Sequence, residues 1–302
     1  MGLLTGASRC RAPAAAFVGL AFLLSVRDAG AESVLFVGNS FTYGADSPVQ
    51  HFRPDTVTDL NRGGVGGVPA LFKALSDEAG LHFEVSLETD AGKGLDYHFQ
   101  QKLALIDRRW DHVILQGYST LDREAPGDPA NLIEYTARFA SRFRAANPRV
   151  DVRLVATWSR ADQTYVSGGH WFGRSIDAMA LEVRAACDRA AAGAALTRAV
   201  IPVGQAWLRA MASGVATDNP YRPLPGGVIN LWAPDNYHAS TQGYYLEALV
   251  IFGSVTHRDP RRFGADELAA RALGIPGPQV VALERIAFES LRDDGPRKPG
   301  VD

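Results

Sequence analysis

Short, continuously apolar runs recur along the chain, and each is followed by turn residues and then by a stretch with helical periodicity. Continuous apolar character is typical of strands buried on both faces, as in a parallel sheet covered by helices. The predicted strands cover Ser33–Val37, Phe83–Leu87, His112–Leu115, Val150–Thr157 and Ala199–Val203. The predicted helices cover Pro69–Ala79, Ala130–Ala146, Ile176–Ala192, Gln242–Val255 and Val280–Leu291. This alternation predicts an α/β fold, a three-layer αβα sandwich around a central parallel sheet of about five strands.

The first 31 residues have the pattern of a secretory signal peptide. Arg9 and Arg11 precede an apolar run at 14–26, and the segment ends with Ala29-Gly30-Ala31. A basic start, a short apolar centre and an A-x-A end mark a cleavable leader. The alternatives are an uncleaved anchor, for which the run is short, and a buried N-terminal helix. We expect cleavage after Ala31 and a periplasmic or secreted chain with no stable membrane insertion.

Composition changes this picture little. Hydrophobic residues make up 46% and charged residues 21% of the 302 residues, as in an ordinary globular protein. The leader holds three arginines and one aspartate, so its removal changes the formal net charge from −2 to −4 and gives no reason to expect nucleic acid as a partner. Cys187 is then the only cysteine, which excludes an intramolecular disulfide. No linker or repeat divides the rest, so we expect one domain at 32–292 and a flexible tail at 293–302.

A serine follows the first predicted strand, in the sequence Gly38-Asn39-Ser40. In open α/β sheets, ligands bind beyond the carboxyl ends of the strands. A glycine permits a sharp turn there, which leaves Ser40 at the rim of the sheet, where backbone N–H groups can meet a developing oxyanion. The alternative interpretation is that Ser40 caps a helix.

A histidine and an aspartate that could serve this serine stand three residues apart, at Asp235 and His238. A serine hydroxyl needs a neighbouring base, and that base needs an orienting carboxylate. The alternative is a surface aspartate beside a half-buried histidine. His112 is a second candidate base, but it begins a predicted strand at the end remote from the expected site. No histidines have a metal-ligand spacing such as H-E-x-x-H, so we expect no metal and no other cofactor.

Four blocks together resemble the ordered motifs of the SGNH/GDSL hydrolases. They read VLFVGNSFTYG at 34–44, AGKGLDYHF at 91–99, VILQGYS at 113–119 and DNYHASTQGYYLEA at 235–248. The chain is most similar to a branch whose nucleophile block reads GNSFT instead of GDS, and the resemblance spans residues 33 to about 255. It implies a flavodoxin-like sandwich and covalent catalysis by serine, histidine and aspartate.

The resemblance also assigns roles to single residues. It implies that Ser40 is the nucleophile and that Asp235 and His238 are its supporting pair. Its oxyanion donors would be the backbone N–H of Ser40, the N–H of Gly92 and the side-chain amide of Gln116, where the family usually has asparagine. Gly94 competes with Gly92 for the second of these positions.

Aromatic residues cluster after the fourth predicted strand. Trp158, His170, Trp171 and Phe172 could form a platform for a sugar or an acyl group, or could simply pin a loop by packing. The leading hypothesis is an exported esterase that removes acetyl or short acyl groups from a small-molecule or carbohydrate ester. Its alternatives are an acyltransferase with the same triad and a non-catalytic glycan-binding protein, which the departure at Gln116 favours.

Overall fold

The computed structural model describes residues 1–3, 6, 31–197 and 199–294. The expected leader therefore lies almost entirely outside the described residues, and so does most of the expected tail. Both remain predictions. No helix within the described ranges is long and apolar enough to cross a membrane.

The centre of the fold is a sheet whose strands run parallel, in the order β2-β3-β1-β4-β5-β6. The strands are β1 (Glu32–Gly38), β2 (Thr58–Asp59), β3 (Phe83–Thr89), β4 (His112–Leu115), β5 (Asp151–Val155) and β6 (Val200–Ile201). Without β2, this order is that of flavodoxin-like sheets. The predicted fold class is confirmed, with six strands in place of about five.

The central strand shows why the sheet is covered on both faces. Val34 and Phe36 pack into one hydrophobic cluster, whereas Leu35 and Val37 pack into another. Successive side chains of a strand point to opposite faces, so a continuous apolar run fills two cores at once. In register, Val34 lies beside Val85 of β3, and the other edge of β1 pairs with β4.

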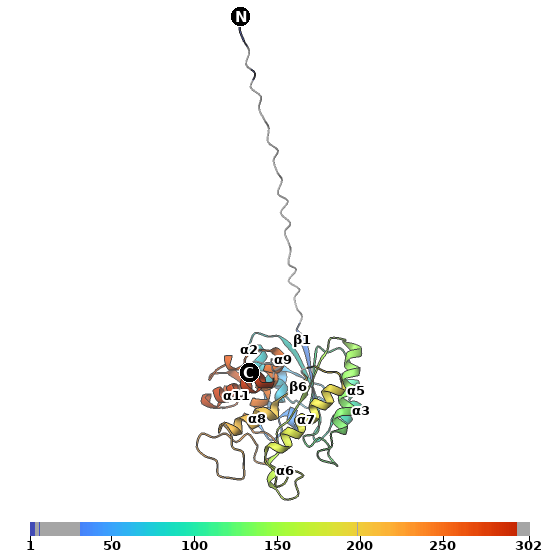
Figure 1. Cartoon of the computed structure of the whole chain (residues 1–302), viewed down its shortest axis with the longest axis vertical. Coiled ribbons are helices and arrows are strands. Elements are labelled where there is room, and N and C mark those ends of the chain that lie inside the picture. Colours follow the sequence, from blue (N-terminus) through green and yellow to red (C-terminus); the bar gives the residue numbers. More distant parts are fainter. Residues whose placement is uncertain (4–5, 7–30, 198, 295–302) are drawn as a thin grey trace, which may run out of the picture. The chain divides into compact units, whose positions relative to one another are not determined.

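Helices form the two outer layers (Figure 1). The longer ones are α2 (Gly67–Glu78), α3 (Leu95–Gln101), α5 (Ala130–Ala146), α7 (Asp177–Gly193), α8 (Val203–Ala212), α9 (Thr241–Thr256) and α11 (Gly277–Asp294). The shorter ones are α1 (Ser40–Tyr43), α4 (Leu103–Ile106), α6 (Ala161–Tyr165), α10 (Leu268–Ala272), and the 3-10 turns η1 (Pro48–His51), η2 (Pro54–Thr56) and η3 (Pro260–Arg262). Helices α3, α5 and α7 cover one face of the sheet; α2, α8 and α9 cover the other, and α11 packs against α8 and α9.

All five predicted helices are present, and the differences lie at element ends. The fifth predicted strand was placed at Ala199–Val203, but Pro202 lies between β6 and the first residue of α8, Val203. Proline has no N–H to donate to the sheet and suits a helix start, which explains the early end of the strand. Helix α9 is buried almost throughout, so it runs through the middle of its layer.

Candidate active site

Ser40 begins α1 at the carboxyl end of the central strand β1. The turn depends on Gly38, because a Cβ there would lie 2.2 Å from Thr42 Oγ1. The side chain that caps α1 belongs to Asn39, whose Oδ1 accepts the Phe41 N–H at 3.2 Å. The alternative role of Ser40 as a helix cap is therefore wrong, and its hydroxyl is left for other contacts.

The amide of Asn39 also joins the ends of three strands. Its Nδ2 donates to the carbonyl oxygens of Lys93 at 2.9 Å and Gly117 at 3.2 Å, which follow β3 and β4. An aspartate could accept the N–H of Phe41, but as a carboxylate it could donate neither of these bonds. This geometry gives a physical reason for asparagine in the GNS sequence.

Gln116 follows β4 as expected, but its side chain supports the turn that carries Ser40. Its Oε1 accepts from the Asn39 N–H at 3.0 Å and the Thr42 hydroxyl at 3.1 Å, and its Nε2 donates to the Gly117 carbonyl oxygen. The residue is 1% exposed and is absent from the lining of the cleft beside Ser40. The expected role is therefore corrected: this amide holds the turn, and it is not placed to donate to an oxyanion in the cleft.

Two backbone N–H groups remain as candidate oxyanion donors. Neither the Ser40 N–H nor the Gly92 N–H makes a hydrogen bond within the described part of the chain, and both residues line the cleft. Gly92 has a φ of 64°, a conformation that glycine adopts at no steric cost. Gly94 is instead buried at the start of α3, where an added Cβ would lie 2.1 Å from Tyr118. Between the two glycines, the geometry favours Gly92.

The turn from Asp235 to His238 forms a closed loop just before α9. An antiparallel bridge between Trp232 and Ala239 frames it. Asp235 Oδ1 accepts the N–H groups of Tyr237 and His238, each at 3.0 Å, while its Oδ2 lies 2.6 Å from His238 Nδ1. The three-residue spacing thus lets one carboxylate fix both the backbone and the imidazole.

The charges in this loop are arranged to keep the carboxylate ionised. Burial alone would raise the pKa of Asp235, but the imidazole of His238 and the two backbone N–H donors outweigh it and lower this pKa. His238 Nε2 is buried and has no hydrogen-bond partner among the described residues, Ser40 Oγ included. In an enzyme without its substrate, the bond between nucleophile and base is often long, so the absence of this bond does not exclude the pair.

A second carboxylate, which sequence reasoning missed, faces the same imidazole. Asp46 Oδ2 lies 2.9 Å from His238 Nδ1, and Asp46 has a φ of 56° in the turn after α1. Asp46, Asp235 and His238 each offer an atom within 4.8 Å of the others and could in principle hold a metal ion. No spacing signal could reveal this group, because it is assembled by the fold.

The cleft beside these residues has a volume of about 550 Å³, and most of its lining residues have polar side chains. Besides Ser40, Gly92 and His238, its wall includes Tyr43, Tyr118, Arg123, Arg160 and Tyr237. The guanidinium of Arg160 lies 3.6 Å from the centre of the Tyr237 ring and pairs with Asp162 at 2.6 Å. The sequence prediction included none of these lining side chains, because they come from separate loops at one edge of the sheet.

The expected aromatic platform is wrong for its two tryptophans. Trp158 and Trp171 are 0% exposed, so neither can contact a substrate, and the packing interpretation holds for both. Phe172 is 53% exposed and His170 is exposed as well, but neither residue lines the cleft beside Ser40. His112, the other candidate base, begins β4 and pairs with Glu32 and Asp151.

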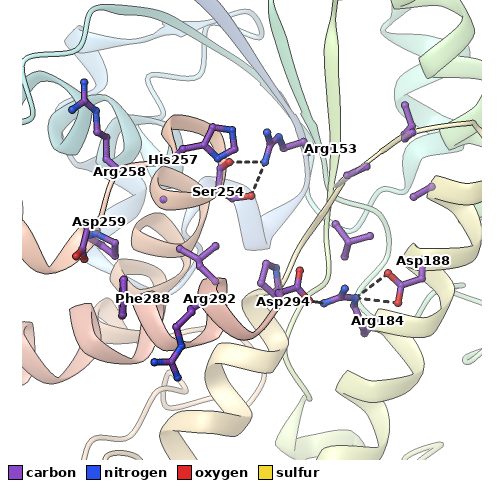
Figure 2. A pocket seen from close by; sticks show the side chains of 18 of the residues that line it. Arg153, Arg184, Asp188, Ser254, His257, Arg258, Asp259, Phe288, Arg292 and Asp294 are labelled. Atoms are coloured by element: carbon purple, nitrogen blue, oxygen red, sulfur yellow. Dashed lines mark hydrogen bonds and ion pairs between the residues drawn. The ribbon is translucent and has the colours of Figure 1, made fainter. Parts of the chain in front are cut away.

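A larger cleft, of about 710 Å³, lies elsewhere and shares no residue with the one beside Ser40 (Figure 2). Its charged groups largely satisfy one another: Arg184 pairs with Asp188 at 3.0 Å and also with Asp294. Arg153 donates to the carbonyl oxygen and the hydroxyl of Ser254 at 2.6 and 2.8 Å. The smaller cleft, with an unpartnered histidine nitrogen beside a serine, is therefore the candidate active site.

Comparison with known proteins finds the same fold at low sequence identity. No protein-family profile and no curated protein sequence matches the chain. A solved structure of a DUF4886 family protein from Bacteroides uniformis is similar with a TM-score of 0.59 and 18% identity, over 87% of this chain and 95% of that one. A protein described as a GDSL-like lipase, from Parabacteroides merdae, has a TM-score of 0.51 and 14% identity, over 75% and 96%. LAE5, an α/β hydrolase from the metagenome of Lake Arreo, has a TM-score of 0.51 and 13% identity, over 74% and 95%.

The first similarity covers most of both chains, and the second structure carries the GDSL name. Both structures are similar in fold to this chain, which has a parallel sheet with helices on both faces. The expected resemblance is confirmed at this level, whereas membership of the GNSFT branch remains a prediction. The chain has the α/β fold of the SGNH/GDSL hydrolases.

Proposed function

We propose that this protein is a serine hydrolase that cleaves small, polar carboxylic esters, with Ser40 as nucleophile and His238 as base. One observation carries the proposal: Ser40 and His238 line one cleft, and His238 Nδ1 is bound to Asp235 while its Nε2 has no partner among the described residues. A nucleophilic serine requires a base with one ring nitrogen free to take its proton and a carboxylate that orients the base through the other nitrogen.

The reaction follows from these positions. Ser40 Oγ attacks the ester carbonyl carbon while His238 Nε2 takes the hydroxyl proton, and the N–H groups of Ser40 and Gly92 donate hydrogen bonds to the oxyanion. The bond to the alcohol oxygen then breaks, His238 returns the proton to the leaving alcohol, and an acyl-Ser40 remains. Water, deprotonated by His238, attacks the carbonyl carbon of this acyl group. The bond to Ser40 Oγ then breaks, His238 returns the proton to Ser40, and the acid is released. Asp235 keeps the proton on Nδ1 and opposes the charge of the imidazolium.

The walls of the cleft support a short acyl group on a polar alcohol such as a sugar. Three phenol rings line it: Tyr43, Tyr118 and Tyr237. Burial raises the pKa of both Tyr43 and Tyr118, so their hydroxyls stay neutral and able to donate hydrogen bonds. The aliphatic side chains of the lining are Ala91 and Pro126, which offer little surface to a long acyl chain.

The alternative functions differ in how the structure bears on them. A non-catalytic glycan-binding protein was expected to use Trp158 and the loop at 165–174. Trp158 and Trp171 are buried and are removed from that surface, whereas Phe172 of the loop is exposed. An acyltransferase would use the same triad and pass the acyl group to an alcohol in place of water. An assay with an acetylated sugar and a free sugar acceptor separates hydrolysis from acyl transfer, because hydrolysis releases acetate and transfer acetylates the acceptor.

The deciding experiment is labelling with a fluorophosphonate, which reacts with activated serines. The purified protein without its leader should be labelled at Ser40 and should hydrolyse p-nitrophenyl acetate faster than p-nitrophenyl octanoate. Ser40→Ala should abolish labelling and hydrolysis, whereas Ser119→Ala, a buried serine that lines the same cleft, should retain both. If a folded wild-type protein is neither labelled nor active, the proposed function is wrong.

A further inference from the structure

The imidazole of His238 meets two carboxylates at the same ring nitrogen. Asp235 Oδ2 lies 2.6 Å from Nδ1 and accepts its hydrogen bond, and Asp46 Oδ2 lies 2.9 Å from the same atom. A neutral imidazole carries a proton on one of its two nitrogens. Two carboxylates at Nδ1 hold the proton there and leave Nε2 as the base. The 2.9 Å contact is close enough for Asp46 to act on the charge of the ring.

Asp46 is fixed in place by the same turn that carries the nucleophile. The hydroxyl of Tyr244, on α9, donates to the carbonyl oxygens of Ser40 at 3.2 Å and Ala45 at 3.1 Å. The Ala45 N–H also donates to the Ser40 carbonyl oxygen, at 3.0 Å. The φ of 56° at Asp46 then directs the chain out of this turn. Asp46 therefore connects the segment of Ser40 to the separate loop that holds His238.

The two carboxylates have different environments. Asp235 also binds two backbone N–H groups, so it organises its own loop. Asp46 makes its close charged contact with His238, and its side chain is 58% exposed. Fold stability does not explain why an exposed carboxylate lies against an imidazole, since exposed ion pairs contribute little to the free energy of unfolding. A role in the chemistry of the ring accounts better for its position.

We propose that Asp46 is a second positioning carboxylate of His238, which shares with Asp235 the tasks of holding Nδ1 protonated and opposing the imidazolium charge. This inference rests on the proposed function, because it assigns His238 the role of base. Asp46 touches no substrate in this role and acts through the histidine alone. Its consequence is that neither aspartate is fully indispensable, whereas the removal of both leaves the base without orientation.

The test compares Asp46→Asn, Asp235→Asn and the double variant, with Asp55→Asn as a control at an exposed site nearby. Asparagine tolerates positive φ, so Asp46→Asn should fold normally. We expect Asp46→Asn to lower kcat about tenfold with KM nearly unchanged. Asp235→Asn should lower kcat about 10²-fold, less than the roughly 10⁴-fold loss typical of a triad with one aspartate, because Asp46 remains. The double variant should fall to the rate of His238→Ala, by more than the product of the two single losses, and Asp55→Asn should match the wild type.

A second readout does not depend on turnover. Proton–nitrogen NMR spectra of the histidine rings identify which nitrogen carries the proton. His238 should be protonated at Nδ1 in the wild type and in each single variant, and should become a mixture of tautomers in the double variant. If Asp46→Asn has no effect on kcat in either background and the double variant keeps the Nδ1 tautomer, the inference is wrong. If the wild-type protein hydrolyses no ester, the proposed function fails, and the tautomers still decide the role of Asp46.

Discussion

The indole of Trp158 stacks on the ring of Phe41, with centroids 4.2 Å apart and planes 2° from parallel. Phe41 follows Ser40 directly, and a second neighbour of the indole is Trp207, stacked at 4.6 Å. Trp158 Nε1 also donates to the Tyr237 carbonyl oxygen at 3.3 Å, next to His238. One buried indole therefore supports both the turn that carries Ser40 and the loop that carries His238.

Trp158→Ala should destabilise the fold and abolish activity together. Removal of a fully buried aromatic side chain costs about 3–5 kcal/mol of unfolding free energy. Trp158→Phe keeps the stacking and loses the Nε1 bond, so it should be milder in both respects. Phe172→Ala, at an exposed aromatic, should change the unfolding free energy by less than about 0.5 kcal/mol. Urea unfolding and hydrolysis rates check all three, and a Trp158→Ala variant of wild-type stability would contradict this role.

The same tryptophan shows where the sequence stops being informative. Trp158 and Trp171 lie in an aromatic-rich region after a strand, a pattern that a substrate platform and a packed core share. What separates the two is exposure, which depends on Phe41 and Trp207 arriving from distant parts of the chain. That Ser40 and His238 lie at one cleft could be predicted, because motif spacing and the end of a strand both pointed to them.

Gln116→Ala should now affect stability more than catalysis. The variant leaves the Asn39 N–H and the Thr42 hydroxyl without their buried acceptor, which costs about 1–3 kcal/mol. The loss in kcat should stay well below the roughly 10²-fold typical of a missing oxyanion donor. A thermal melt and a Michaelis curve on one preparation measure both. A stable variant with a 10²-fold lower kcat would restore the oxyanion role.

The fold was easier to predict than the site, for reasons that lie in particular elements. Strand β1 and helix α5 carry their own periodicity, so local pattern suffices. Strand β2, with two residues, has no such pattern and exists because Thr58 pairs with Ser86. No sequence pattern predicts a role for Asp46, because its contact with His238 is formed only when the fold brings the two residues together.

Removal of metal ions should leave activity unchanged. His238 Nδ1 donates a hydrogen bond to Asp235 in the proposed mechanism, so its lone pair is not offered to a cation. Chelation with EDTA should therefore change kcat/KM by less than about twofold. Added Zn²⁺ should inhibit by displacing the Nδ1 proton, and less strongly in Asp46→Asn, which lacks one of the three ligand groups. Loss of activity on chelation, restored by a metal, would contradict the mechanism.

Export is tested by the mature N-terminus. The basic start, the apolar run and the A-x-A end predict cleavage after Ala31. Expressed with its own leader in a Gram-negative host, the protein should be recovered from periplasm or medium beginning at Glu32. Replacement of Ala31 by a bulky residue should slow processing. A cytosolic protein with an intact N-terminus would argue against export.

A buried acid far from the motifs should make stability depend on pH. Glu284, on α11, is 1% exposed, and its Oε1 has no hydrogen-bond partner among the described residues. Burial, together with the nearby carboxylates of Glu267, Asp259 and Glu78, raises its pKa to about 7, against the lowering effect of the Gly264 N–H that donates to its Oε2. The folded protein therefore binds this proton more tightly than the unfolded chain, whose glutamates titrate near pH 4.5. Stability from this group is complete below about pH 4.5 and is lost as the pH rises through 7.

Glu284→Gln isolates this effect, because the amide oxygen can still accept the Gly264 N–H but carries no charge at any pH. At pH 5 the variant should be equal to or slightly less stable than the wild type, since a buried amide N–H₂ replaces an unpartnered oxygen. At pH 8 it should be more stable, and the difference between the two pH values should reach about 1–3 kcal/mol. Glu124→Gln, at an exposed site, should have the same unfolding free energy as the wild type at pH 5 and at pH 8. Urea unfolding at each pH measures these free energies, and a Glu284→Gln variant whose stability parallels the wild type from pH 5 to pH 8 would mean that Glu284 titrates as an ordinary surface acid.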